Sequence, residues 1–144
     1  ISQYGSVEVT KYQMIHKYSK IMHICSQVES NIRQDMDSLD AIKSVLPAGT
    51  LSGAPKIRAC EIIDELEPVP RGIYGGALGY VDFGGNMDTC IAIRMAVKKN
   101  NKVYVQAGGG IVADSVPANE YQESANKAKA VMLAIENAKE AVRI

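Results

Sequence analysis

The sequence lacks the features that would point to a membrane or a nucleic-acid partner. Lys plus Arg and Asp plus Glu are balanced at 16 each among 144 residues, so no net field attracts nucleic acid or an anionic membrane surface. No apolar run approaches the roughly 20 residues of a membrane-spanning helix. The first residues, ISQYGSVEV, contain neither an initiator Met nor a secretion signal, and this abrupt start suggests that upstream sequence was removed. We expect a soluble, cytoplasmic protein.

Cysteine is scarce, and its spacing argues against metal or redox motifs. Cys25, Cys60 and Cys90 are odd in number, far apart in sequence and form no CxxC pair. We expect them to be reduced and mostly buried. Internal repeats, low-complexity tracts and linkers are also absent, so residues 1–144 are expected to form one domain with one core.

Strand and helix patterns alternate along the chain. Residues 7 to 30 are rich in β-branched and aromatic side chains, and MHICSQVES alternates like a strand with His23 on one face. Residues 71 to 112 have the composition of strands and turns, with a hairpin turn at Asn100–Asn101. Helices are expected at 36–46, from Pro55 to Pro68 and at 117–142. This order predicts an α+β layered fold with antiparallel strands.

A predicted strand through Arg94 raises the first functional question. Alternation along MDTCIAIRMAVKK predicts a core face formed by Ile91, Ile93, Met95 and Val97. The opposite face carries Arg94 between the small residues Ala92 and Ala96. A guanidinium with small neighbours is poorly packed unless something fills the space above it, so Arg94 could bind a ligand.

Three consecutive glycines separate a predicted strand from the last predicted helix. Gly108, Gly109 and Gly110 allow close backbone approach and expose N–H groups that can hold a carboxylate or phosphate. The pattern is neither G-x-G-x-x-G nor G-x-x-x-x-G-K-[ST], so a nucleotide is poorly supported. An ordinary turn remains the alternative.

The last predicted helix carries a possible metal site. Its 100° per residue places Glu120, Glu123 and Lys127 within about 60° of one another on one face. Carboxylates three residues apart can bind a hard cation such as Mg²⁺. The alternative is that the acidic residues complement the helix dipole, with Glu123 and Lys127 forming an ordinary i, i+4 pair.

Three further polar residues are candidates. Histidine is a common general acid or base, so His23 is a candidate for that role, although a lone histidine is more often a structural residue. Thr50 and Tyr74 lie beside glycines, so their hydroxyls could project into a cleft. Local sequence does not choose between these readings.

Three long motifs together resemble a known enzyme family. PAGTLSGAPKIRACEIIDELEP, RGIYGGALGYVDFGGNMDTCIAIR and QAGGGIVADSVPANEYQESANKA closely resemble the carboxy-terminal part of the chorismate-utilising enzymes, from about Gly5 to Ile135. Within this family, YGGALGY and YVQAGGGIVADSVP look closer to anthranilate synthases than to aminodeoxychorismate synthases. The resemblance implies a two-sheet antiparallel α/β sandwich with outer helices. Residues 1–144 would be the carboxy-terminal part of its chorismate-binding catalytic domain, with the amino-terminal portion absent.

The same resemblance implies a Mg²⁺-dependent lyase reaction on chorismate in tryptophan biosynthesis. Ammonia, delivered from glutamine by a partner amidotransferase subunit, component II, would add to the ring with loss of the ring hydroxyl. Elimination of pyruvate would then give anthranilate. Two alternatives are an aminodeoxychorismate synthase of the folate pathway, which aminates a different ring position, and a non-catalytic binding or assembly module with the same fold.

The resemblance also implies catalytic and metal-binding roles for matching residues. His23, in IMHI, would lie beside the leaving hydroxyl. Glu123 would be a direct Mg²⁺ ligand, with Glu120 positioned by the ion and its waters. Lys127 would neutralise the ring carboxylate and the ligand cluster.

Substrate-binding roles are implied for five further positions. Arg94 and Tyr74 would hold the enolpyruvyl carboxylate. The other matching positions are Thr50 and the backbones of Gly108 and Gly110.

Two departures from the family pattern affect these expectations. Gly109 stands where relatives often have Ala, a change that should be tolerated. The family's further metal-binding and acidic residues lie in an EHxMLVD-like motif, which would precede the first residue of this chain. We therefore expect the chain to be inactive alone, and its unpaired sheet edges to favour homo-oligomers or marginal stability.

Overall fold

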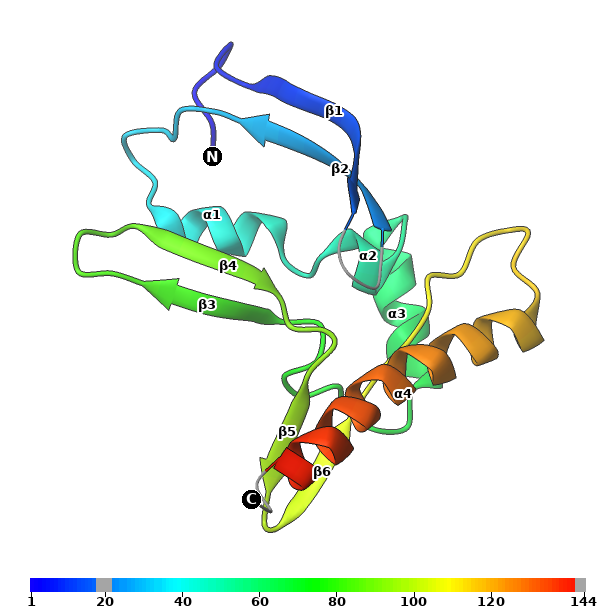
Figure 1. Cartoon of the computed structure of the whole chain (residues 1–144). Helices are drawn as coiled ribbons and strands as arrows, with labels where there is room; N and C mark the ends of the chain where they lie inside the picture. The colour runs from blue at the N-terminus through cyan, green and yellow to red at the C-terminus, as the bar shows by residue number, and fades with distance from the viewer. Residues whose placement is uncertain (18–21, 142–144) are drawn as a thin grey trace. The chain divides into compact units, whose positions relative to one another are not determined.

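The computed structural model describes residues 1–17 and 22–141 and contains two compact units. The first comprises Ile1–Val45 with Val81–Met87, and the second comprises Leu46–Tyr80 with Asp88–Ile144. Figure 1 shows the order of the elements along the chain.

The first unit is built on an antiparallel hairpin. Strands β1 (Glu8–Lys17) and β2 (Met22–Glu29) pair with His16 opposite His23, and β2 confirms the strand predicted at MHICSQVES. Helix α1 (Ser38–Val45) follows. It begins after Asp37, whose side-chain Oδ1 accepts the backbone N–H groups of Leu39 and Asp40 at 2.8 and 2.9 Å. This is N-capping by a short carboxylate.

The second unit starts with two helices and a strand pair. The short α2 (Gly49–Ser52) and the longer α3 (Lys56–Leu66) follow each other, with Pro55 immediately before α3. Strands β3 (Ala77–Val81) and β4 (Met87–Ile91) then run in opposite directions as a two-stranded sheet. The segment between them, which is grouped with the first unit, is closed by a hydrogen bond from the N–H of Asp82 to the carbonyl of Asn86, at 2.9 Å.

The predicted turn at Asn100–Asn101 is confirmed. Strands β5 (Ala96–Lys99) and β6 (Lys102–Val105) pair antiparallel with Lys99 opposite Lys102. Both asparagines have positive φ, 52° and 57°, as a two-residue hairpin turn of the primed type requires.

The strand expected through Arg94 is interrupted, which corrects the predicted faces. Between β4 and β5 the chain turns irregularly, and Arg94 has a φ of 55°. Ala92 is buried at 1% exposure, and it pairs through its backbone with the turn before β3: its N–H donates to the Gly76 carbonyl and its carbonyl accepts the N–H of Gly75. Ile93, assigned to the core face by alternation, is 39% exposed.

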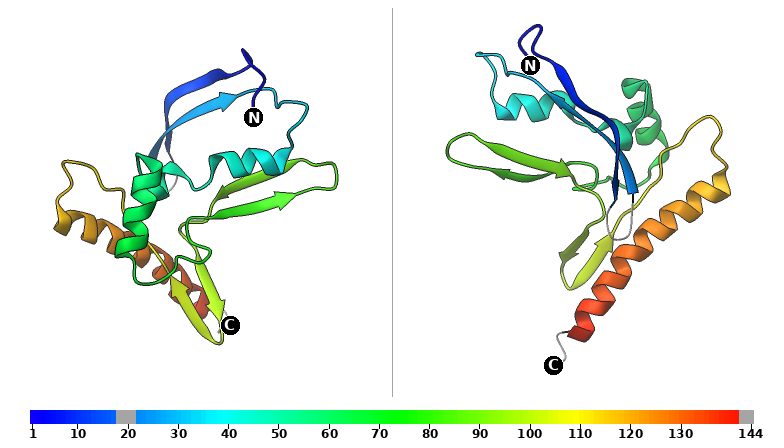
Figure 2. Two further views of the ribbon diagram at one scale, coloured as in Figure 1. Left: turned by 180° about the vertical axis from the view of Figure 1, so that it is seen from behind. Right: turned by 45° about the horizontal axis from the view of Figure 1, so that its top comes forward.

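The long carboxy-terminal helix is confirmed. Helix α4 (Pro117–Ala141) agrees with the expected 117–142 except at residue 142, which lies outside the described residues. It contacts β6, and both views of Figure 2 show it beside the β5–β6 hairpin. No described helix is long and apolar enough to cross a membrane.

The expected single core is not found within the described residues. Among their apolar side chains, only Ala92 is buried. Many large apolar side chains of the described strands and helices are exposed. Cys25 and Cys60 are half-buried and Cys90 is exposed, so burial of the cysteines was also over-predicted.

Gly79 is required by the close approach of β3 and β4. A Cβ at this position would overlap the carbonyl oxygen of Asp88 and lie 2.7 Å from the Cα of Thr89. Because both are backbone atoms, the strands would have to separate. We expect Gly79→Ala to lower the free energy of unfolding of the intact protein by about 1–3 kcal/mol, measured by denaturant titration.

Gly49→Ala is the matched control for that substitution. A Cβ there would meet no atom within 4 Å, and φ is not positive. Equal unfolding midpoints for the two variants would show that the close approach of the strands does not constrain Gly79.

Candidate functional site

The glycine segment lies directly against one face of α4. The Lys127 Nζ donates a hydrogen bond to the Gly108 carbonyl at 3.3 Å. A Cβ on Gly109 would stand 3.1 Å from Glu120 Oε2 and 3.6 Å from the Ser124 hydroxyl. The absence of a side chain at Gly109 therefore allows the Glu120 carboxylate to approach the backbone. Since that carboxylate ends a flexible side chain, a small shift would accommodate an alanine.

Glu123 and Lys127 form an ion pair on this face of the helix. The hydrogen bond from Lys127, its positive charge and the charge of Arg94 hold the pKa of Glu123 below its usual value, against slight desolvation. Arg94, whose charge makes the smallest of these contributions to the pKa of Glu123, lies on the irregular segment between β4 and β5. Glu123 is 55% exposed and Lys127 27% exposed, so the carboxylate remains accessible to a ligand.

Tyr74 joins the same cluster from a turn before β3. Its hydroxyl lies 3.4 Å from the position of a Cβ on Gly108. The next residues, Gly75 and Gly76, hydrogen-bond to Ala92, two positions before Arg94. These backbone bonds connect the turn that carries Tyr74 to the segment that carries Arg94.

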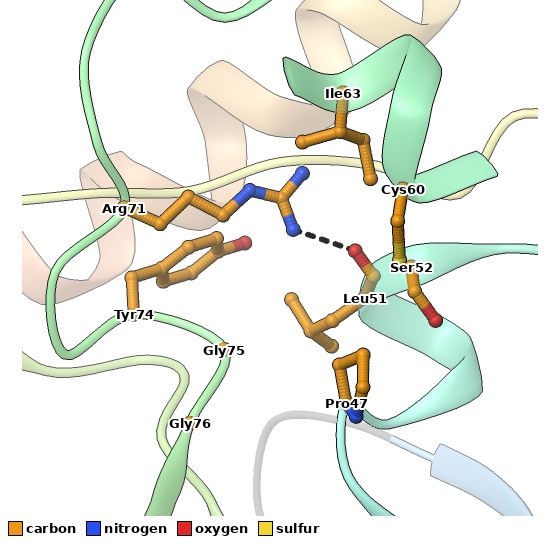
Figure 3. A pocket seen from close by; sticks show the side chains of 9 residues that line it. All are labelled: Pro47, Leu51, Ser52, Cys60, Ile63, Arg71, Tyr74, Gly75 and Gly76. Atoms are coloured by element: carbon orange, nitrogen blue, oxygen red, sulfur yellow. Dashed lines mark hydrogen bonds between the residues drawn. The ribbon is translucent and has the colours of Figure 1, made fainter. Parts of the chain in front are cut away.

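A cavity of roughly 220 Å³ lies beside Tyr74 (Figure 3). Its walls come from α2, α3 and the turn before β3: Pro47, Leu51, Ser52, Cys60, Ile63, Arg71, Tyr74, Gly75 and Gly76. Thr50 is exposed on α2 and is not part of this lining, although the adjacent Leu51 is. A Cβ on Gly75 would lie 3.6 Å from the Leu51 side chain, so α2 packs on the turn of Tyr74.

His23 lies in the first unit and is described apart from the other candidates. It is exposed on β2, opposite His16 in the hairpin. Gly110 is also exposed, and a Cβ there would meet no atom within 4 Å. The structure thus brings together Tyr74, Arg94, Gly108, Glu120, Glu123 and Lys127.

The two glutamates of this face, Glu120 and Glu123, could bind a magnesium ion that keeps most of its water ligands. No group of three or more His, Cys, Asp or Glu side chains with metal-binding geometry occurs in the described part of the chain. Glu120 and Glu123 supply two carboxylates from one turn of α4. The Glu120 carboxylate lies beside Gly109, and the Glu123 carboxylate pairs with Lys127, which bonds the Gly108 carbonyl. Mg²⁺ is commonly bound by one or two carboxylates and keeps several waters. The two glutamates fit this pattern.

Sequence reasoning missed Arg71 as a part of this region. Its guanidinium hydrogen-bonds the Leu51 carbonyl and the Glu67 carboxylate, and it lines the cavity beside Tyr74. Its place three residues before Tyr74, in RGIYGG, was the available signal.

Comparison with known proteins identifies the family. The model of the family described as chorismate binding enzyme matches residues 1–133. The chain belongs to the chorismate binding enzymes. Anthranilate synthase component 1 of Pseudomonas aeruginosa is 58% identical over 99% of this chain, and that of Acetivibrio thermocellus is 57% identical over 97%. The chain spans only 29% and 28% of the length of these relatives.

Solved structures of chorismate-utilising enzymes share the fold. The crystal structure of anthranilate synthase component I from Streptococcus pneumoniae is similar with a TM-score of 0.88 and 51% identity, over 91% of this chain and 30% of that one. A putative 2,3-dihydroxybenzoate-specific isochorismate synthase from Bacillus anthracis is similar with a TM-score of 0.82 and 26% identity, over 92% and 36%. The predicted α+β class and the chorismate-utilising fold are confirmed.

Proposed function

We propose that this chain is part of an anthranilate synthase component I. The enzyme would convert chorismate and ammonia, supplied from glutamine by a component II amidotransferase subunit, to anthranilate and pyruvate. The observation that carries this proposal is the cluster of Arg94, Lys127, Glu123 and the glycine segment in a chain 58% identical to an anthranilate synthase component 1. Such a cluster suits a dicarboxylate substrate, because cations and free N–H groups must face its charges.

The cations would bind the two carboxylates of chorismate. Arg94, with the Tyr74 hydroxyl, would hold the enolpyruvyl carboxylate, because a guanidinium offers paired donors to a carboxylate. Lys127 would face the ring carboxylate, at the position where it now pairs with Glu123 and the Gly108 carbonyl. The backbones of Gly108 and Gly110 and the Thr50 hydroxyl would complete the binding of the substrate.

Mg²⁺ would be held by Glu123 directly and by Glu120 through its waters. When bound, the ion would polarise the ring carboxylate and offset the charge that develops as the leaving groups depart. Glu120 would keep its carboxylate against Gly109, where the structure places it. His23 would donate a proton to the departing ring hydroxyl, which would leave as water.

The test is product analysis of the full-length protein that contains this chain. Incubated with chorismate, Mg²⁺ and ammonia, it should release anthranilate and pyruvate in equal amounts. Aminodeoxychorismate as the product would move the protein to the folate-pathway branch of the family. Absence of any chorismate turnover, with chorismate binding retained, would favour a non-catalytic module.

A further inference from the structure

Arg71 connects two segments that carry candidate substrate-binding residues. Its Nε and Nη2 donate to the two oxygens of the Glu67 carboxylate at 2.8 and 2.5 Å. Its Nη1 donates to the Leu51 carbonyl at 2.6 Å. Figure 3 shows the side chain extending alongside the Tyr74 ring toward Leu51. One guanidinium therefore contacts α2, the end of α3 and the turn before β3.

The Leu51 carbonyl needs a partner from outside its own helix. It belongs to the last turn of α2, where carbonyl groups lose their amide partners. The residue four positions later is Pro55, which has no N–H to donate. Arg71 supplies the donor, and a positive charge at a helix carboxy-terminus is also electrostatically favourable.

The other end of this connection is the turn that carries Tyr74. The N–H of Tyr74 donates to the Arg71 carbonyl at 3.1 Å, so Arg71 opens the turn in which Tyr74 stands. Gly72 within the turn has a φ of 61°, which favours glycine. Arg71 thus sets the position of Tyr74 through its backbone and the position of α2 through its side chain.

We propose that Arg71 is a positioning residue that fixes Thr50 on α2 relative to Tyr74, with Glu67 orienting its guanidinium. The inference rests on the proposed function, in which Thr50 and Tyr74 both face chorismate. Loss of Arg71 frees α2 to move, and an error of about 1 Å in a binding group costs up to about a hundred-fold in rate. A lysine does not replace it, because one ammonium cannot bind the carboxylate bidentately and reach Leu51 as well.

The experiment uses the full-length enzyme and steady-state kinetics with chorismate, with a double-mutant cycle as its central part. Arg71→Ala should lower kcat/KM about 10- to 100-fold, mainly by raising KM. If Arg71 acts through Thr50, most of this effect should disappear in the Thr50→Ala background, because the two losses are then not additive. Arg71→Lys should restore little, and Glu67→Gln should give an intermediate loss.

Arg58→Ala provides the matched control. Arg58 also pairs with two glutamates of α3, Glu61 and Glu65, but within the described residues it makes no hydrogen bond or ion pair with α2 or Tyr74. Its kinetic constants should equal those of the wild type. Equal constants for Arg71→Ala and Arg58→Ala, or fully additive effects of Arg71→Ala and Thr50→Ala, would overturn the inference. A wild-type enzyme that forms no anthranilate would instead refute the proposed function.

Discussion

Replacing Glu123 with glutamine in the full-length enzyme should abolish most of the chorismate reaction. We expect kcat/KM at saturating Mg²⁺ to fall by at least a hundred-fold. Loss of a residue that only supports a metal ligand costs up to about a hundred-fold, and Glu123 is proposed to be a ligand itself. The neutral amide has nearly the same shape but weakens the attraction to the cation. The measurement is the Mg²⁺ dependence of anthranilate formation, which should shift to higher concentration in the variant.

Glu136→Gln provides the control for the Glu123 variant. Glu136 is an exposed glutamate of the same helix, and among the described residues Lys127 pairs with Glu123 and the Gly108 carbonyl, not with Glu136. Its substitution should leave the Mg²⁺ dependence unchanged. A Glu123→Gln enzyme with wild-type Mg²⁺ dependence would remove Glu123 from the metal site.

The charges around Glu123 determine in which direction Mg²⁺ binding should change with pH. Because Lys127 and Arg94 lower its pKa, Glu123 stays ionised below the pH at which an unperturbed glutamate takes up a proton. Its contribution to Mg²⁺ binding is complete above the unperturbed pKa and is lost as the pH falls through the lowered one. Lys127→Met should therefore move the acid limb of Mg²⁺ binding to higher pH.

The second large effect concerns the 144 residues on their own. We expect the isolated chain to form no anthranilate from chorismate, ammonia and Mg²⁺, and to be oligomeric or only marginally stable. Large apolar side chains are exposed on most of its elements, as in Val9, Ile24, Leu39, Ile57, Leu78, Phe83, Tyr104 and Met132. The chain also spans only 29% of a relative that is 58% identical.

Little apolar surface of the described residues is removed from water, and this limits the stability of the isolated chain. Ordering each residue costs roughly 1–2 kcal/mol of backbone entropy, and apolar burial returns about 25 cal/mol per Å². With Ala92 alone buried among the apolar residues that the structure describes, this balance is unfavourable. Light scattering on a sizing column and thermal circular dichroism test the point. A sharp monomeric peak with a cooperative melt, or measurable anthranilate, would contradict it.

Elements with a strong local signal were predicted well. The turn at Asn100–Asn101 and the helix from Pro117 onward follow from residues that are close in sequence. The strand through Arg94 was not predicted well. The alternating pattern does not account for the backbone hydrogen bonds of Ala92 with Gly75 and Gly76, which lie in a different part of the chain. At this segment Ala92 is buried and Ile93 is exposed, the reverse of the prediction.

The family was recognisable from the three long motifs of the sequence. The helical face that carries Glu120, Glu123 and Lys127 was predictable too, because three- and four-residue spacing fixes which side chains share a face. The packing of the glycine segment against this face, with Lys127 bonded to Gly108 and Glu120 beside Gly109, became visible in the three-dimensional structure alone. The tertiary structure also decided that Arg71 reaches Leu51, 20 residues earlier in the chain. These contacts join distant segments, and their geometry depends on how the intervening turns fold, which no local spacing specifies.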